Sequence, residues 1–244
     1  MVGYTYTDKG SRNINEDSCA LIETDDNRIC AVVADGLGGH GGGSDASNTT
    51  VEVIKRLFME DEEHEPSRLA AWIQIANQEV LQHQHIGFEM KSTLVLLTIK
   101  HGIAIWAHVG DSRLYHFMNG KLIEQTFDHS VSQMAVIRGE ISQSEIRGHI
   151  DRNRLLRALG MDDSIRAEVS EPKDIRNSCH AFLLCTDGFW EYVTEREMEK
   201  DLKHSRSAEI WMDKMLSRHR RRTKNIDHDN NSAIAIILNN INEV

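Results

Sequence analysis

The chain has 244 residues, of which 40% are hydrophobic and 27% are charged, as is typical of a folded globular protein. Its formal net charge of −10 argues against nucleic acid or an anionic membrane as the main partner. No hydrophobic stretch is long enough to span a membrane, and the first residues lack a signal-peptide pattern, so we expect a cytoplasmic protein.

Runs rich in β-branched and other hydrophobic residues predict β-strands along much of the chain. The expected strands cover residues 3–8, 18–23, 28–34, 93–100, 103–108, 113–118, 165–169, 181–186 and 233–239. Only His101 and Gly102 separate the strands at 93–100 and 103–108, which predicts a β-hairpin.

Hydrophobic residues at helical spacing predict helices in three places. The first stripe contains Ala46, Thr50, Val53, Ile54, Leu57 and Phe58, the second Leu69, Trp72, Ile73, Ala76 and Val80, and the third Ala208, Trp211, Met212, Met215 and Leu216. Because strands occur in hairpins and helices in blocks, we expect antiparallel sheets covered by helices. No glycine- or serine-rich linker interrupts the sequence, so we expect a single domain over residues 1–244.

Acidic residues flank three of the predicted strands. Asp35 and Asp187 each follow a hydrophobic run and precede a glycine, and Asp229 stands shortly before the last strand. A sheet holds a carboxylate at a strand end rigidly, while the adjoining turn leaves it exposed. If these ends converge, they form an all-oxygen pocket suited to Mg²⁺ or Mn²⁺, and we expect this pocket to be the active site.

Two further segments add to this predicted site. In residues 10–17, Glu16 and Asp17 can ligate a metal or bind its water while Arg12 binds a phosphoryl group, although a solvated turn is the simpler interpretation. In residues 35–43, glycines let the backbone approach an ion closely, and the carbonyl of Gly36 can be a ligand. A nucleotide-binding P-loop is disfavoured, because the next lysine is Lys55.

Two shorter segments have ordinary structural interpretations. Residues 109–113 contain Gly110 and Asp111 between predicted strands, and a hairpin turn is the favoured interpretation. Residues 186–191 place Phe189 and Trp190 after Asp187, and we expect these aromatic side chains to pack as core beneath the loop.

The four cysteines are expected to be reduced thiols. Cys19, Cys30, Cys179 and Cys185 show no CxxC spacing, and Cys30 and Cys185 lie inside hydrophobic runs. A zinc site is therefore not expected. None of the cysteines has an arginine at Cys-x5-Arg spacing, which argues against a phosphocysteine mechanism.

Taken in order, these motifs resemble the metal-dependent Ser/Thr protein phosphatases of the type 2C (PPM) family, in particular bacterial stand-alone members. The motifs are Arg12-x-x-Asn15-Glu16-Asp17, Asp35-Gly36-x-Gly-Gly-His40, Gly110-Asp111-Ser112-Arg113, Asp187-Gly188 and Asp229-Asn230-x-Ser232. Residues 126–160 also resemble the bacterial members, and the resemblance extends over residues 4–238.

The resemblance implies an α+β fold, a four-layer α-β-β-α sandwich in which helices flank two central antiparallel β-sheets. Residues 128–160 match the family's variable flap beside the active site, which is expected to be mobile and to influence substrate choice.

The resemblance also implies a centre of two Mn²⁺ or Mg²⁺ ions at one edge of the sandwich. In it, Asp35 matches the bridging ligand and Gly36 the backbone-carbonyl ligand, while Asp187 and Asp229 match terminal ligands of one ion.

Other positions match residues around this centre. Glu16 and Asp17 match carboxylates that act largely through waters of the other ion, and Arg12 matches the arginine that binds the substrate phosphate. Asp111 matches an aspartate of a third, weaker metal site, to which Glu191 can contribute.

The implied reaction is direct attack on the phosphorus by a water that bridges the two metals, with Arg12 helping to offset the developing charge. In some relatives a histidine two residues after the bridging aspartate is a candidate general acid, but this chain has Leu37 there. His40 is a candidate substrate-binding residue or a loop-stabilising one. We therefore assign no general acid.

We interpret the chain as a monomeric phosphatase of phosphoserine and phosphothreonine in proteins that opposes a Ser/Thr kinase. The alternatives are a related phosphatase dedicated to one small regulatory phosphoprotein, or a non-catalytic phosphoprotein-binding module. The presence of every expected ligand argues against the module. The basic run at residues 219–224 is interpreted as a solvated helix end, or as a docking site for an acidic phosphorylated partner.

Overall fold

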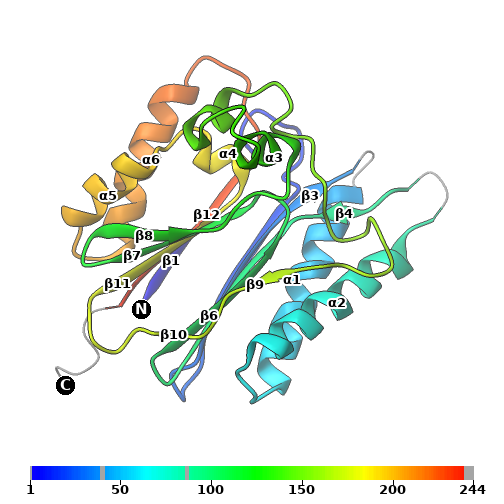
Figure 1. Ribbon diagram of the computed structural model, residues 1–244, viewed down its shortest axis with the longest axis horizontal. Helices are drawn as coiled ribbons and strands as arrows, with labels where there is room; N and C mark the ends of the chain where they lie inside the picture. Colours follow the sequence, from blue (N-terminus) through cyan, green and yellow to red (C-terminus); the bar gives the residue numbers. More distant parts are fainter. Residues whose placement is uncertain (1, 39–41, 86–87, 239–244) are drawn as a thin grey trace.

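The computed structural model describes residues 2–38, 42–85 and 88–238. Two antiparallel β-sheets pack face to face, and helices cover both outer faces (Figure 1). The predicted four-layer α+β sandwich is therefore confirmed. Among the described residues, no helix is both long and apolar enough to cross a membrane.

The first sheet has five strands in the order β1-β12-β11-β7-β8, and all neighbours are antiparallel. Its strands are β1 (Gly3–Asp8), β7 (Arg113–Met118), β8 (Lys121–Gln125), β11 (His180–Cys185) and β12 (Asn231–Leu238). Its outer face is covered by α4 (Asp187–Trp190), α5 (Glu195–Lys203) and α6 (Ala208–Thr223) (Figure 1).

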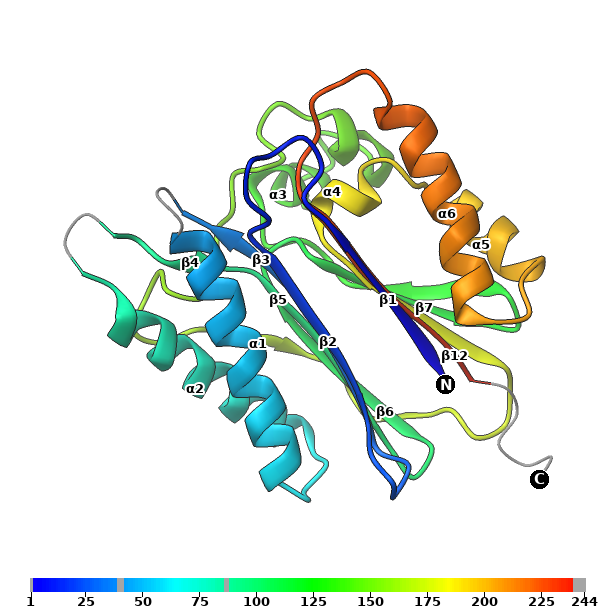
Figure 2. The ribbon, with the colours of Figure 1, turned by 180° about the vertical axis from the view of Figure 1, so that it is seen from behind.

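The second sheet follows the order β10-β6-β5-β3-β2, with β4 paired to β3 and β9 paired to β6. Its strands are β2 (Asp17–Glu23), β3 (Ile29–Leu37), β4 (Lys91–Ser92), β5 (Leu94–Lys100), β6 (Ile103–Val109), β9 (Glu168–Val169) and β10 (Lys173–Asp174). Figure 2 shows α1 (Gly42–Glu60) and α2 (Pro66–His83) along its outer face.

Alternate residues of the central strands face two different hydrophobic cores. In β3, Ala31 and Val33 pack between the two sheets, while Cys30 and Val32 pack against α1 and α2. A strand covered on both faces needs hydrophobic residues at every position, which explains the continuous hydrophobic runs in the sequence. Each fully buried aliphatic side chain stabilises the fold by roughly 1.5–3 kcal/mol, so the two cores together fix the strands that lead to the site.

The predicted hairpin between β5 and β6 is confirmed, and both of its turn residues have positive φ. His101 has φ 51° and Gly102 has φ 73°, as a two-residue type I′ turn requires. The three predicted helices are confirmed as α1, α2 and α6.

Other expectations need correction. The strand expected at 165–169 is only the two-residue β9, and strand β8 and helix α5 were not predicted. The last residue of the strand expected at 233–239 lies outside the described residues, and β12 itself begins earlier, at Asn231.

The hairpin turn expected at residues 109–113 is wrong. β6 belongs to the second sheet and β7 to the first, so Gly110 and Asp111 carry the chain from one sheet to the other. β6 already pairs with β5 on one edge and with β9 and β10 on the other, which leaves no edge for β7. Gly110 adopts φ 99°, and a Cβ there would lie 2.7 Å from the side chain of Thr93.

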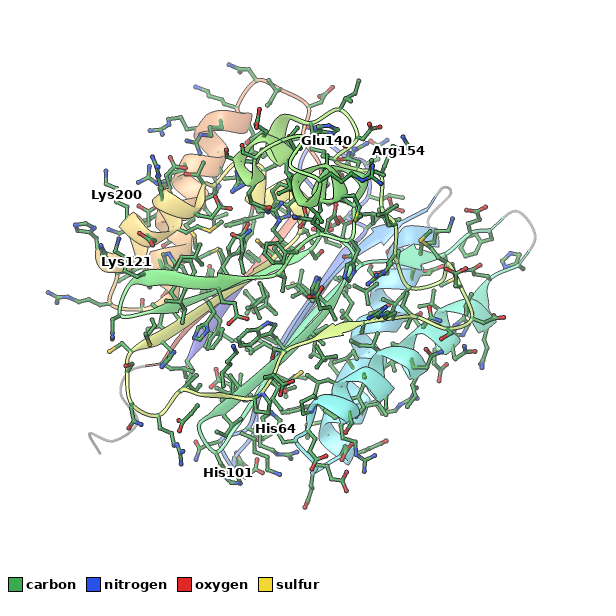
Figure 3. The ribbon with its side chains drawn as sticks, in the orientation of Figure 1. His64, His101, Lys121, Glu140, Arg154 and Lys200 are labelled. Atoms are coloured by element: carbon green, nitrogen blue, oxygen red, sulfur yellow. The ribbon has the colours of Figure 1, made fainter. Side chains whose placement is uncertain are left out.

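Several connecting segments gather at one end of the sandwich. The loops before β2 and before β12 meet there (Figures 1 and 2), and the backbone N–H of Ser11 donates to the carbonyl of His228 over 3.1 Å. The 128–160 segment, which contains α3 (Val131–Ile137) and the 3₁₀ helix η1 (Gln143–Gly148), lies at the same end. Figure 3 labels Glu140 and Arg154 of this segment there, and His101 at the opposite end.

Candidate metal centre

A cavity of about 480 Å³ opens at the end of the sandwich where these segments meet. Its lining includes most of the residues singled out from the sequence, namely Arg12, Glu16, Asp35, Gly36, Asp111, Asp187 and Asp229. The structure therefore brings together acidic side chains from β3, from the connection between the sheets, from α4 and from the loop before β12.

Asp35 lies within β3 rather than at its end, because the strand continues to Leu37. Its backbone N–H donates to Oγ1 of Thr93 over 2.9 Å, and its carbonyl accepts from the N–H of the same threonine over 2.8 Å. Across the pair of strands Asp35 stands opposite Asp17. Like charges at opposed strand positions repel each other, so this arrangement favours a bound cation.

Asp17 is buried behind the cavity and does not line it. Its Oδ2 accepts a hydrogen bond of 3.0 Å from Oγ1 of Thr186, the residue before Asp187. Its Oδ1 is also buried, and no hydrogen-bond partner for it lies among the described residues. A buried carboxylate oxygen without a partner is costly, and a bound ion or its water would satisfy it.

Asp187 is the first residue of α4, and only Thr186 separates it from the end of β11. The residues that follow it in α4 pack around it. The side chains of Phe189 and Trp190 are buried beneath the loop, as predicted. The indole N–H of Trp190 donates to the carbonyl of Asp111 over 3.0 Å, which joins α4 to the connection between the sheets.

Asp229 is held by Arg12 from the loop after β1. Nε and Nη2 of Arg12 donate to the two carboxylate oxygens of Asp229 over 2.9 and 2.7 Å. Arg12 is largely exposed, with 61% of its side chain accessible, so it can also reach a ligand in the cavity. The side-chain amide of Asn230 joins the loop before β12 to the loop between β1 and β2. It accepts from the N–H of Glu16 over 2.8 Å and donates to the carbonyl of Ile14 over 3.0 Å.

Glu16 connects the site to the start of α1. Burial raises the pKa of its carboxyl group, and the backbone N–H groups of Ser44 and Gly43, in the first turn of the helix where anions are stabilised, oppose the rise. Its carbonyl accepts from the N–H of Gly36 over 3.1 Å. β3 and α1 approach so closely that a Cβ on Gly36 would lie 2.0 Å from the carbonyl oxygen of Gly43, which explains the glycines in this part of the sequence.

Burial and mutual repulsion raise the pKa values of the clustered carboxyl groups. The pKa of Asp35 lies well above its usual range because of burial and the charges of Asp17 and Asp187, and the pKa of Asp111 is raised for similar reasons. Burial, with smaller contributions from neighbouring carboxylates, raises the pKa of Asp17 to about 7 and that of Asp187 to about 6.

The donor set fits a hard divalent cation. All candidate ligand atoms are oxygens, several carboxylates crowd one partly buried cavity, and one buried carboxylate oxygen lacks a hydrogen-bond partner within the described part of the chain. Mg²⁺ and Mn²⁺ prefer such ligands, and two positive charges would offset the repulsion that raises these pKa values.

The two remaining predicted residues are placed differently. Glu191 lines a neighbouring cavity of about 320 Å³, and its Oε1 accepts from Nη2 of Arg152 over 2.8 Å. Burial raises the pKa of Glu191, and the charge of Arg152 opposes the rise. His40 lies outside the described residues.

A buried network behind the site was not predicted. Nε and Nη2 of Arg113 donate to the two carboxylate oxygens of Asp128, each over 2.7 Å, and both side chains are almost inaccessible. The guanidinium carbon of Arg113 lies 3.5 Å from the centre of the Trp190 ring, within cation–π range. The network joins the start of the 128–160 segment to the helix that carries Asp187.

A histidine cluster outside the cavity has the residue types of a metal site, but the ring nitrogens that face Glu168 carry protons. His108, His129 and Glu168 lie together, and burial lowers the pKa of both histidines, that of His129 to about 3. Nε2 of His108 lies 2.7 Å from the carbonyl oxygen of Phe127 and must donate to it. Nδ1 of His129 accepts from the N–H of Gly110, so the proton of this neutral ring sits on Nε2. Neither Nε2 therefore offers a lone pair to an ion beside Glu168.

The cysteines carry no disulfide, as expected. All four are free thiols, with Cys30 and Cys185 buried in the core and Cys179 exposed.

Comparisons with known proteins agree with the fold and identify the family. The family model for protein phosphatase 2C matches residues 3–231. Serine/threonine phosphatase stp of Listeria monocytogenes is 34% identical over 210 residues, which cover 82% of each chain.

Solved structures share the whole architecture. The crystal structure of serine/threonine phosphatase Stp1 from Staphylococcus aureus is 26% identical, covers 97% of this chain and 94% of its own, and superposes with a TM-score of 0.86. The catalytic domain of the phosphatase PstP, solved in complex with two manganese ions, shares the fold with a TM-score of 0.78 at 24% identity, and covers 97% of this chain and 98% of its own. The chain therefore belongs to the protein phosphatase 2C family of metal-dependent Ser/Thr phosphatases.

Proposed function

We propose that this phosphatase binds two divalent cations, Mn²⁺ or Mg²⁺, in the 480 Å³ cavity. Asp35 would contact both ions, Asp187 and Asp229 would each contact one, and Gly36 would offer its carbonyl. The observation that supports this most strongly is the group of crowded carboxylates with raised pKa values beside the unpartnered Oδ1 of Asp17. PstP, whose solved structure contains two manganese ions, offers a precedent for the number.

The remaining roles follow from the positions of the side chains. The cations would supply Lewis-acid stabilisation and activate the attacking water. Arg12 would bind the phosphoryl oxygens, because its planar guanidinium is exposed at the cavity and matches phosphate with two parallel hydrogen bonds. Asp17 would hold water in the shell of one ion, as would Glu16. Asp111 would contribute to a third, weaker site, and Glu191 would reach that site only if Arg152 released it.

The proposed substrates are phosphoserine and phosphothreonine residues of proteins, placed there by a Ser/Thr kinase that the enzyme opposes. The 34% identical relative from Listeria monocytogenes is named a serine/threonine phosphatase, which supports this assignment. We propose a monomeric enzyme in a reducing compartment such as the cytoplasm, where four free thiols are stable.

Calorimetric titration of the metal-free protein with Mn²⁺ tests the site. Two bound ions per chain are expected in the wild type, and strongly weakened binding is expected in Asp35→Asn. The exposed Asp25→Asn is the matched control and should bind as the wild type does. Unaltered binding in Asp35→Asn would contradict the ligand assignment, and absence of binding in the wild type would favour a phosphoprotein-binding module.

A further inference from the structure

Three of the residues that line the carboxylate cavity are aliphatic. Ile14, Leu37 and Leu155 line it, and they come from the β1–β2 loop, the last residue of β3 and the 128–160 segment. Ile14 is 55% exposed, although its neighbours in the loop are polar. Single exposed aliphatic residues are ordinary on protein surfaces, but a group around one functional cavity indicates contact with a ligand.

The polar residues of the lining also favour an uncharged side chain over an acidic one next to the phosphorylated residue. Among the described residues that line this cavity, Arg12 is the only cation, and the proposed function assigns it to the phosphate. Two arginines of the 128–160 segment have acidic partners, since Arg152 pairs with Glu191 at 2.8 Å and Arg154 with Asp151 at 3.2 Å. An acidic side chain next to the phosphorylated residue would therefore meet carboxylates and amides among the described lining residues, and no cation besides Arg12.

The neighbouring cavity offers no comparable surface. It shares Arg12, Asp187 and Asp229 with the first cavity, but none of the described residues that line it is aliphatic. Of these two cavities beside Arg12, only the first has aliphatic residues among its described lining.

We propose that Ile14, Leu37 and Leu155 determine substrate specificity by binding an aliphatic side chain next to the phosphorylated serine or threonine. The enzyme then prefers phosphosites flanked by leucine, isoleucine or valine to sites flanked by aspartate or glutamate. This inference rests on the proposed function, because it requires the phosphate at the carboxylate end of the cavity. Partial burial of one aliphatic side chain supports a preference of about tenfold in kcat/KM.

The test uses phosphothreonine peptides that differ only in the residue before or after the phosphothreonine, which is leucine, alanine or aspartate. With metal-loaded enzyme, kcat/KM should be highest for leucine and lowest for aspartate on one side of the phosphothreonine. Ile14→Ala should move the leucine-to-alanine ratio toward one, and Ile14→Lys should raise the relative rate on the aspartate peptide.

Ile123→Ala is the matched control, because Ile123 is 49% exposed on β8 and lines a different cavity. This variant should keep the wild-type ratios. Equal rates on all peptides in the wild type, or unchanged ratios in both Ile14 variants, would overturn the inference while leaving the phosphatase assignment intact. Absence of hydrolysis on every peptide with metal bound would overturn both.

Discussion

Replacement of Asp187 by asparagine should stabilise the metal-free protein while it weakens metal binding at the proposed site. Burial, helped by the charges of Asp229 and Glu191, raises the pKa of Asp187 from 3.8 to about 6. The native state therefore binds this proton more tightly than the unfolded state does. Below pH 3.8 the carboxyl group is protonated in both states, and as the pH rises through 6 the native state loses the corresponding stability. The full loss is about 3 kcal/mol.

Asparagine has nearly the same shape and no charge, so it avoids this loss. In the presence of chelator, we expect the free energy of unfolding of Asp187→Asn to exceed that of the wild type by about 3 kcal/mol at pH 8 and by about 1 kcal/mol at pH 4.5. For a chain of this size, the difference at pH 8 corresponds to a melting temperature higher by roughly 6–12 °C.

Urea denaturation at the two pH values, with chelator and then with Mn²⁺, measures the effect. The exposed Asp25→Asn is the control for loss of one negative charge and should differ little from the wild type. With Mn²⁺ the order should reverse, because only the wild type gains the full binding free energy. If metal-free Asp187→Asn is no more stable than the wild type at pH 8, burial of the Asp187 charge does not destabilise the native state.

Further predictions concern the supporting structure and the thiols. Asp128→Ala leaves Arg113 buried without its partner and should lower the free energy of unfolding by about 3–5 kcal/mol, measured in urea. Gly36→Ala places a Cβ 2.0 Å from the carbonyl oxygen of Gly43, so it should displace the start of α1 and weaken Mn²⁺ binding at least tenfold in calorimetry; wild-type affinity would contradict this. In the folded protein a thiol reagent should first modify Cys179, the exposed cysteine, and a serine at this position should remove the fast phase.

Much of the fold could be predicted because its central strands and longest helices carry strong local patterns. Strand β3 is hydrophobic at every position from Ile29 to Ala34, and α1 shows a regular apolar stripe. The grouping of Asp35, Asp187 and Asp229 was also predictable, because each carboxylate lies within or beside a strand that the hydrophobic runs locate.

The missed elements have weak local signals. β8 is a short edge strand with only partly covered side chains, and it pairs with β7 alone among the described strands. α5 buries few hydrophobic residues, chiefly Met198 and Leu202, and its beginning is set by a capping box of Thr194 and Glu197. Elements of this kind are stabilised by their neighbours more than by their own pattern.

The misassigned and unpredicted features depend on long-range pairing. The turn at Gly110 was expected to join paired strands, but which sheet β7 enters is decided by β11, far along the chain. The pair between Arg113 and Asp128 likewise depends on the fold of the 128–160 segment over Trp190. No residue spacing in the sequence reports such contacts.

Hydrolysis of a phosphothreonine peptide by metal-depleted enzyme, before and after addition of Mn²⁺ or Mg²⁺, shows whether catalysis depends on the proposed metal centre. An aryl phosphate serves as a second substrate, and Asp187→Asn is compared with the wild type. If the proposed metal centre is catalytic, there should be no turnover with chelator, recovery when either metal is added, and a loss of at least a hundredfold in Asp187→Asn. Turnover that persists in chelator, or that is unchanged in this variant, would contradict a catalytic role for this centre.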